Sequence, residues 1–175
     1  MLEGHEGALI DLLQELKRDQ KAGNPIPPNV FEALLPICPQ ANFEFVVCRR
    51  GHSGGIEVLL VKRPDTVPSY PGCWHCPGAF IRTGDKPDDV CERIRTGKMA
   101  GATIKSIRFL DFQMYSDPSR NGMTVVRLVH LVEIEGEPPV GEFFEIFPTP
   151  NLPEPLVWEQ PMLIRAAAMF EFQAP

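Results

Sequence analysis

The sequence predicts an α/β or α+β sandwich, in which helices cover a mixed β-sheet. Three observations predict this class. An amphipathic stretch lies near the N-terminus, several runs are rich in β-branched and aromatic residues, and two later stretches have helical periodicity. The chain has 175 residues and no internal repeat, which favours one domain with a single core.

The N-terminal part is predicted to be helical over residues 7–20, where leucines recur at steps of three and four residues. The next stretch, NPIPPNVFEALLPICPQ, is interrupted by prolines, so we expect a connection that wraps over the domain. We therefore expect residues 1–40 to form a helix and a proline-rich connection packed on the domain. Residues 41–175 are expected to form the domain itself.

The central strands are predicted from runs bounded by Gly, Pro or Asp: FEFVVCRR, GIEVLLVKRP, SIRFLDFQMYSD and VVRLVHLVEIEG. HSGG at residues 52–55 predicts a hairpin between the first two. A helix is predicted over residues 87–97, because Pro87 suits the first helical position and two acids follow it. The last helix is predicted to begin near Pro161.

Composition restricts the classes of partner. The formal charge is −6 and no basic tract is present, which argues against a general nucleic-acid binder. The N-terminal apolar run is interrupted by Asp11, and no segment has the roughly 18 apolar residues that cross a membrane. The five cysteines are irregularly spaced, as expected for reduced thiols. We therefore expect a cytoplasmic protein that binds a small molecule, without nucleic acid or membrane partners.

The order of motifs carries a family resemblance. VLLVKRP is followed by WHCPGAF and then by the loop and helix GAFIRTGDKPDDVCERIRTGKMAG. This order resembles the Nudix hydrolase family, whose box reads Gly-x5-Glu-x7-Arg-Glu-U-x-Glu-Glu-x-Gly-U, with U an aliphatic residue. The similarity covers residues 43–172. It implies a Nudix-like α/β/α sandwich with a mixed sheet, an N-terminal helical extension, and a small nucleotide-like ligand.

The box can be aligned by placing Ala79 at its first Gly. The resemblance then puts Asp85 at the first Glu place and Arg93 at the Arg place. The three carboxylates of the family's helix are replaced by Ile94, Gly97 and Lys98.

A second alignment takes Gly101 as the closing Gly of the box. The three carboxylate places then fall on Arg95, Lys98 and Met99. Neither alignment supplies a carboxylate there. The family hydrolyses a nucleoside diphosphate linked to another group, using Mg²⁺ or Mn²⁺ held by oxygen ligands. The substitutions disfavour a cation in that place.

Several acids remain near the box. By the resemblance, the candidate metal ligands are Asp85, Asp88 and Glu92. The candidate catalytic residues are Asp85, Glu92 and Arg93. The structural alternative is that Asp85 is a turn residue and that the acids of the first helical turn stabilise the helix dipole.

A second set of residues has side chains suited to a phosphate or a base. Lys98, held near the metal position, would neutralise a phosphate without a cation. The other candidate ligand-binding residues are Arg63, Trp74, Arg120 and Trp158. Each has a structural alternative: a surface cation, a core aromatic, a hairpin turn or a packed connector.

Cys73-Trp-His-Cys76 has the spacing of half a zinc site or of a disulfide oxidoreductase. No second pair of cysteines is visible, and Pro77-Gly78 prevents the helix that the redox chemistry needs. Two thiols on a strand are the expected arrangement.

Two functions follow. The first is a Nudix-type protein that binds a nucleotide or a nucleoside-diphosphate-linked ligand, with the usual Mg²⁺-dependent pyrophosphohydrolase activity lost or altered. The alternative is an active, atypical hydrolase that uses Mg²⁺ or Mn²⁺. The N-terminal leucine stripe either packs on its own domain or forms a homodimer interface.

Overall fold

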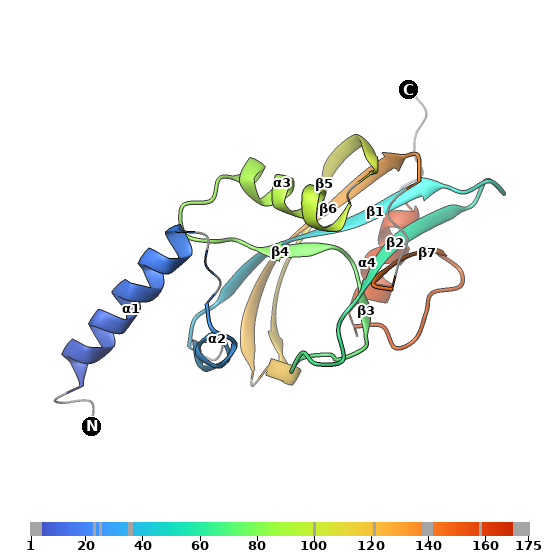
Figure 1. Cartoon of the computed structure of the whole chain (residues 1–175). Helices are drawn as coiled ribbons and strands as arrows, with labels where there is room; N and C mark the ends of the chain where they lie inside the picture. The colour runs from blue at the N-terminus through green and yellow to red at the C-terminus, as the bar shows by residue number, and fades with distance from the viewer. Residues whose placement is uncertain are drawn as a thin grey trace.

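The computed structural model describes residues 5–22, 24, 26–34, 37–99, 101–120, 122–137, 142–157 and 159–169. Within them, seven strands form one mixed sheet (Figure 1). The strands are β1 (Gln40–Arg50), β2 (Ile56–Lys62), β3 (Trp74–His75), β4 (Gly78–Phe80), β5 (Thr103–Asp117), β6 (Met123–Glu135) and β7 (Phe144–Pro148). The helices are α1 (Glu6–Lys21), α2 (Pro28–Leu34), α3 (Pro87–Lys98) and α4 (Gln160–Met169), with a short 3-10 turn, η1 (Pro118–Arg120).

The sheet is mixed because β1 runs parallel to β6 and antiparallel to β2. The order is β3-β2-β1-β6-β5, with β7 paired to β2 and β4 paired to β1. The first half of β1 pairs with β4 and its second half with β2, so the sheet divides along this strand. The predicted mixed sheet and the predicted β1–β2 hairpin are confirmed.

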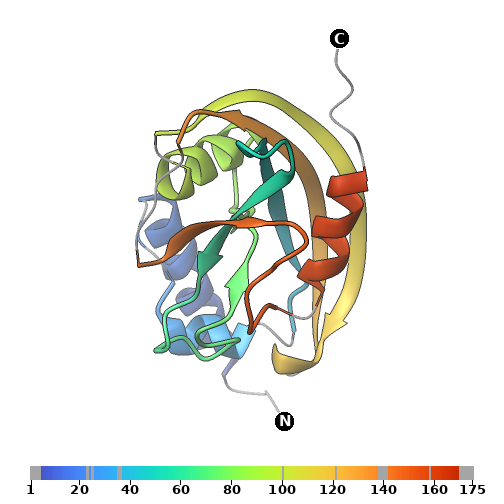
Figure 2. The ribbon, with the colours of Figure 1, turned by 90° about the vertical axis from the view of Figure 1, so that its right-hand side faces the viewer.

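The alternation of side chains along β1 gives the sheet two apolar faces. Phe43, Phe45 and Val47 belong to one buried cluster, which α3 completes with Val90 and Ile94. The residues between them on β1 face the opposite side, where α4 supplies Leu163, Ile164 and Ala167. Figure 2 shows α3 and α4 on opposite sides of the central strands. The sandwich predicted from the sequence is thus formed by two helices, one for each face.

Helices α1, α3 and α4 confirm the helices that the sequence predicts. The prediction for residues 24–40 was wrong in one part, because α2 forms within this stretch. Pro28 is the first residue of α2. The backbone N–H at this position has no partner within the helix, so a proline here costs no helical hydrogen bond. The prolines therefore delimit a short helix here.

The N-terminal helix α1 extends away from the sheet (Figure 1). Leu9, Leu12 and Leu13 are 48%, 46% and 43% exposed, whereas Leu16 is buried. The packing of residues 1–40 on the domain, and the boundary at residue 41, stay predictions. In the described part of the chain, no helix combines the length and the apolar character that a membrane crossing requires.

Ile94 provides a test of how α3 is used. Its side chain is completely buried in the cluster beneath α3, so the sheet packs against a position where the family box carries a carboxylate. We expect Ile94→Ala to lower the free energy of unfolding by about 2–5 kcal/mol, because it leaves a cavity in the core. Chemical denaturation would measure this. Thr96→Ala, on the exposed side of α3, should change the value by no more than about 0.5 kcal/mol. Equal effects of the two changes would contradict this packing.

Candidate functional site

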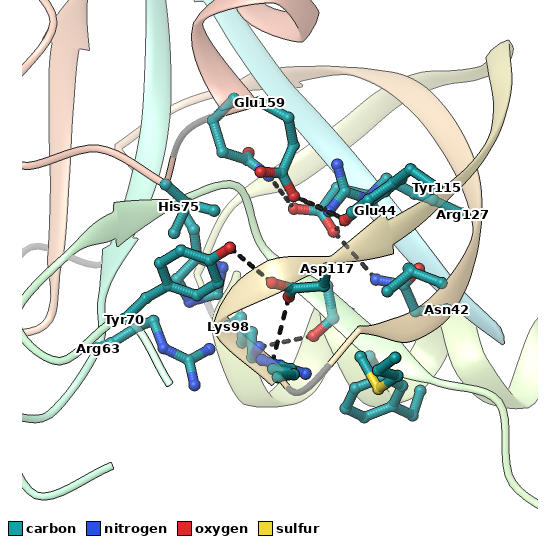
Figure 3. A pocket seen from close by; sticks show the side chains of 18 residues that line it. Asn42, Glu44, Arg63, Tyr70, His75, Lys98, Tyr115, Asp117, Arg127 and Glu159 are labelled. Atoms are coloured by element: carbon teal, nitrogen blue, oxygen red, sulfur yellow. Dashed lines mark hydrogen bonds and ion pairs between the residues drawn. The ribbon is translucent and has the colours of Figure 1, made fainter. Parts of the chain in front are cut away.

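A polar cavity of about 200 Å³ lies beside the sheet face that α4 covers (Figure 3). Its walls come from β1, β4, β5 and β6, from the residues just before α4, and from the last residue of α3. Figure 3 shows Arg63 and Lys98 at one end, and Glu44, Tyr115 and Glu159 at the other. The cavity therefore has a cationic end and an end rich in carboxylates.

Three cationic side chains form the first end of the cavity. The Lys98 ammonium donates a hydrogen bond to the carbonyl of Gly78, with an Nζ to O distance of 2.6 Å. Arg63 Nε donates to the carbonyl of Ser69 at 2.7 Å, and Arg120 also lines the cavity. Burial lowers the pKa of Lys98, and the positive charge of Arg63 lowers it further, although Glu44 opposes this. These cations repel one another in a site partly removed from water, so an anion there would be stabilised.

His75 lies among the same cations but carries no charge at neutral pH. Burial, together with the positive charges of Lys98, Arg63 and Arg120, lowers its pKa to about 3. A neutral imidazole offers one donor and one acceptor nitrogen. His75 can therefore orient a ligand without adding to the charge of the site.

Glu44 is a buried carboxylate on β1 with several partners. Its Oε1 accepts from Gln160 Nε2 at 2.9 Å, and its Oε2 accepts from Asn42 Nδ2 at 3.2 Å. Arg127 Nε lies 3.5 Å from the same Oε2. Burial raises the pKa of Glu44, although the charges of Arg127 and Lys98 oppose this. Glu44 thus balances the charge of neighbouring cations.

Glu159, just before α4, holds the other side of Arg127. Arg127 Nη2 lies 2.6 Å from Glu159 Oε1, and it also donates to the Tyr115 hydroxyl. The Tyr115 hydroxyl donates to the same carboxylate oxygen at 2.6 Å. Burial raises the pKa of Tyr115 well above its usual value, so this hydroxyl remains protonated. These contacts join the carboxylate before α4 to β5 and β6.

Asp117 fixes the rim of the cavity at the end of β5. It accepts from the Tyr70 hydroxyl at 2.8 Å and from the backbone and hydroxyl of Ser119 at 2.9 and 2.8 Å. Arg120 Nε lies 3.5 Å from Asp117 Oδ2. The turn η1 therefore presents Arg120 toward the cavity.

Several buried polar atoms at the cavity have no hydrogen-bond partner among the described residues. They are Asn42 Oδ1, Arg120 Nε, Arg127 Nε and Nη1, and Glu159 Oε2. All four residues line the cavity. Because buried polar groups are normally paired, this concentration is typical of a place that receives a ligand or water.

Asp85 and Arg93 are the acidic and the basic residue that the sequence resemblance places at box positions, and they bind each other. Asp85 Oδ2 lies 2.8 Å from Arg93 Nη2 and accepts the Arg82 backbone N–H at 2.7 Å. Arg93 also donates to the carbonyl of Phe80 at 2.8 Å. The Arg93 guanidinium holds the pKa of Asp85 below its ordinary value. This pair fastens the loop after β4 to α3, and neither residue lines the polar cavity.

The remaining box candidates lie elsewhere on α3. Glu92 and Arg95 form an exposed ion pair, with Oε1 and Nη2 2.5 Å apart. Asp88 is exposed in the first turn, and Gly97 is exposed near the end of the helix. Lys98 is thus the replaced box position that reaches the polar cavity, since Ile94 lies in the core.

Of the candidate aromatic residues, Trp74 packs on Phe147 at a ring-centroid distance of 5.0 Å, and Lys62 lies over its ring. It belongs to the border of the core and does not line the polar cavity. Trp158 lies outside the described residues. All five cysteines are free thiols, and Cys73 and Cys76 flank the short strand β3.

Sequence reasoning named Arg63, Lys98 and Arg120, which the structure brings to one cavity. It did not single out the carboxylate end of the cavity. A signal was present, because Glu44 and Arg127 are charged residues that each interrupt a run of apolar residues in a predicted strand. The missed lining residues at that end include Asn42, Glu44, Tyr115, Arg127 and Gln160.

No protein-family model matches the chain, and no curated protein matches it. Solved structures do. The NUDIX domain of Shewanella oneidensis NrtR, complexed with ADP ribose, has 20% identity and a TM-score of 0.61, over 82% of this chain and 92% of that one. The protein has the Nudix fold.

Two further structures show the same Nudix fold. The MutT NUDIX hydrolase of Burkholderia pseudomallei has 26% identity and a TM-score of 0.56, over 75% of this chain and 97% of that one. A mutT/nudix family protein of Listeria innocua has 19% identity and a TM-score of 0.54, over 74% of this chain and 92% of that one. The likeness thus covers most of this chain and nearly the whole of each of these domains.

The residues of this Nudix fold do not fit the Mg²⁺ or Mn²⁺ of the family's reaction. Asp85 is bound to Arg93, and Glu92 to Arg95, so neither carboxylate is directed at a shared position. Glu44 already faces Arg127 and lies near the Lys98 ammonium. Among the described residues, no group of three or more His, Cys, Asp or Glu side chains is placed to hold a metal ion.

The pair of Asp85 and Arg93 predicts a specific pH dependence of stability. Because the pKa of Asp85 is lowered in the folded protein, its contribution is present above its unfolded pKa and is lost as pH falls through the folded one. We expect Asp85→Asn to lower the free energy of unfolding by about 1 kcal/mol at pH 7. The difference from the unsubstituted protein should shrink below about pH 4.

Urea denaturation at pH 7 and pH 3 would measure both values. Asp88→Asn is the matched control, because Asp88 is an exposed acid at the start of the same helix. It should change the free energy of unfolding by no more than about 0.5 kcal/mol at either pH. A pH-independent loss in Asp85→Asn would argue against the ion pair as its cause.

Proposed function

We propose that the protein binds a nucleotide or a nucleoside-diphosphate-linked ligand without a divalent cation. The phosphate groups would contact the cationic end of the cavity, formed by Lys98, Arg63 and Arg120. The observation that carries the proposal is the Lys98 ammonium, which lies in the polar cavity at a position where the family box has a carboxylate. A positive charge there attracts phosphate oxygens directly.

The charge of the site supports this proposal. Four cations and three carboxylates line the cavity, so its formal charge is +1 in a chain whose formal charge is −6. The mutual repulsion of Arg63 and Arg120 contributes, after burial, to a lowered pKa of Arg63. A bound phosphate would relieve this repulsion, and its affinity would benefit from the low local dielectric constant.

The opposite end of the cavity supports a ligand with hydrogen-bond donors. Glu159 Oε2 and Asn42 Oδ1 are buried acceptors to which no described residue donates. Sugar hydroxyls or amino groups would satisfy them. The NrtR domain of similar fold is complexed with ADP ribose, a molecule that has both phosphates and hydroxyls. A ligand of this class matches both ends of the cavity.

Lys98→Met tests the proposal, because it removes the charge and keeps a long side chain. We expect the affinity for ADP or ADP-ribose, measured by calorimetry in EDTA, to fall about 10- to 100-fold, since one charge-assisted hydrogen bond is lost. Lys105→Met is the matched control. Its ammonium is exposed on β5, 3.5 Å from Glu133.

The control should bind as the unsubstituted protein does. Unchanged affinity in Lys98→Met would refute the proposal. So would release of monophosphate from these ligands with Mg²⁺ or Mn²⁺ that is absent in EDTA, because that result would establish the atypical hydrolase instead. Thermal unfolding of both variants would show that each is folded.

The lowered pKa of Lys98 gives a second, independent test. Ligand phosphate binds the protonated amine, so affinity should fall as pH rises toward a pKa lower than that of an exposed lysine. Lys98→Arg should bind without this fall, because a guanidinium stays protonated throughout. Calorimetry would be run between pH 7 and pH 10 with both proteins. Ionisation of the ligand changes the affinity of both proteins equally, so it cancels when their profiles are compared. Parallel profiles would show that Lys98 does not contact the phosphate.

Three parts of the sequence hypothesis stay proposals beside this one: a cytoplasmic location, the lack of a nucleic-acid partner and homodimer formation. The net charge of −6 supports the second. The exposed leucines of α1 support the third, because an amphipathic helix normally covers its apolar side.

A further inference from the structure

A second cavity adjoins the polar one. Its volume is about 550 Å³, and it lies between the N-terminal segment around α2 and the side of the domain formed by β4 and α3. Four residues line both cavities: Gly78, Ala79, Phe80 and Lys98. The two cavities are therefore adjacent, and they share the residues of β4 and the lysine proposed to bind phosphate.

The walls of the second cavity are largely apolar. The N-terminal segment contributes Ile26, Phe31 and Leu34, and the domain contributes Phe80 and Ile81. Phe31 and Phe80 contact each other, with ring centroids 5.6 Å apart and planes inclined by 59°. Two tilted aromatic rings in an apolar hollow are suited to a flat, poorly hydrated group.

Gly97 opens this cavity on the side of α3. A Cβ atom at Gly97 would meet no heavy atom within 4 Å, so the missing side chain leaves free space. By the sequence resemblance, this is a place where the family's box has a carboxylate. A Glu side chain would occupy part of the hollow and would place a negative charge next to the phosphate site.

The polar cavity is small for the whole of the proposed ligand. Its volume of about 200 Å³ is smaller than the roughly 300–1,000 Å³ of ordinary ligand pockets. A nucleoside-diphosphate-linked molecule therefore extends beyond it. The adjoining cavity shares Lys98 and Gly78 with the phosphate site, and it offers the apolar surface that the polar cavity lacks.

We infer that the cavity between the N-terminal segment and α3 binds the aromatic base of the phosphate-bearing ligand. This inference rests on the proposed function and adds to it. Lys98, at the junction, holds the phosphate, and Gly97, one residue earlier, leaves room for the ring. The N-terminal segment thereby becomes part of the binding site, and the ligand class narrows to molecules with an aromatic group close to a phosphate.

Gly97→Leu tests the inference by filling the space. Gly97 is exposed near the end of α3, and leucine has the higher helix propensity, so the variant should fold. Gly97→Ala is the matched control, because it gives the same kind of backbone change and adds only one methyl group. Thermal unfolding of both variants confirms that any loss of binding is local.

Calorimetry in EDTA would compare two probes with the whole chain, pyrophosphate for the charge alone and ADP for the charge and the base. In Gly97→Leu we expect the affinity for ADP to fall about tenfold or more, through loss of aromatic burial. Pyrophosphate should bind this variant as tightly as the unsubstituted protein. Gly97→Ala should bind both probes almost normally.

The remaining outcomes separate the two ideas. If Gly97→Leu binds ADP as tightly as the unsubstituted protein, the base does not occupy this cavity, and the inference is overturned while the proposed function stands. If the unsubstituted protein binds neither pyrophosphate nor ADP, the proposed function fails and the inference fails with it. If Gly97→Leu weakens both probes equally, the change acts on the phosphate site and the inference is also overturned.

Discussion

The partial burial of the Lys98 ammonium is the constraint on which the candidate functional site depends. A cation removed from water is costly unless it is paired and hydrogen-bonded. Here Gly78 supplies a carbonyl and Glu44 a nearby negative charge. Lys98 is also the last residue of α3, where the helix dipole favours a cation. Carboxylates at this helix end would be disfavoured unless a metal ion compensated their charge. A lysine at this position therefore favours an anionic ligand, whereas a carboxylate would favour a cation.

The charges around this lysine form a connected arrangement across the sheet. Glu44 on β1 faces Arg127 on β6, and Arg127 is bound to Glu159 before α4. All three residues are buried, and Arg127 and Glu159 each have side-chain atoms without a hydrogen-bond partner among the described residues. Such a network stabilises the fold less than apolar packing would. Under the proposed function, a bound ligand would satisfy the remaining donors and acceptors.

The fold was predictable from the sequence because periodicity and turn residues agree along most of the chain. Helix α2 was missed because prolines mark both an interruption and a helix start. In the site, Arg63, Lys98 and Arg120 were found through their place after strands, turns and box motifs. Glu44 was not, because which strand positions face a common cavity depends on pairing between distant segments. Trp74 packs on Phe147 of β7, which lies nearby because β7 pairs with β2. The sequence does not reveal this pairing.

The changes in the box are physically related to one another. The Ile94 side chain is buried in the core, and a Cβ atom at Gly97 would meet no heavy atom within 4 Å. Lys98 places a positive charge in the polar cavity. Meanwhile the pair of Asp85 and Arg93 keeps the loop attached to α3, which preserves the frame in which the other three positions act. The helix thus combines structural contacts with a positive charge in the polar cavity, which is the arrangement that the proposed function uses.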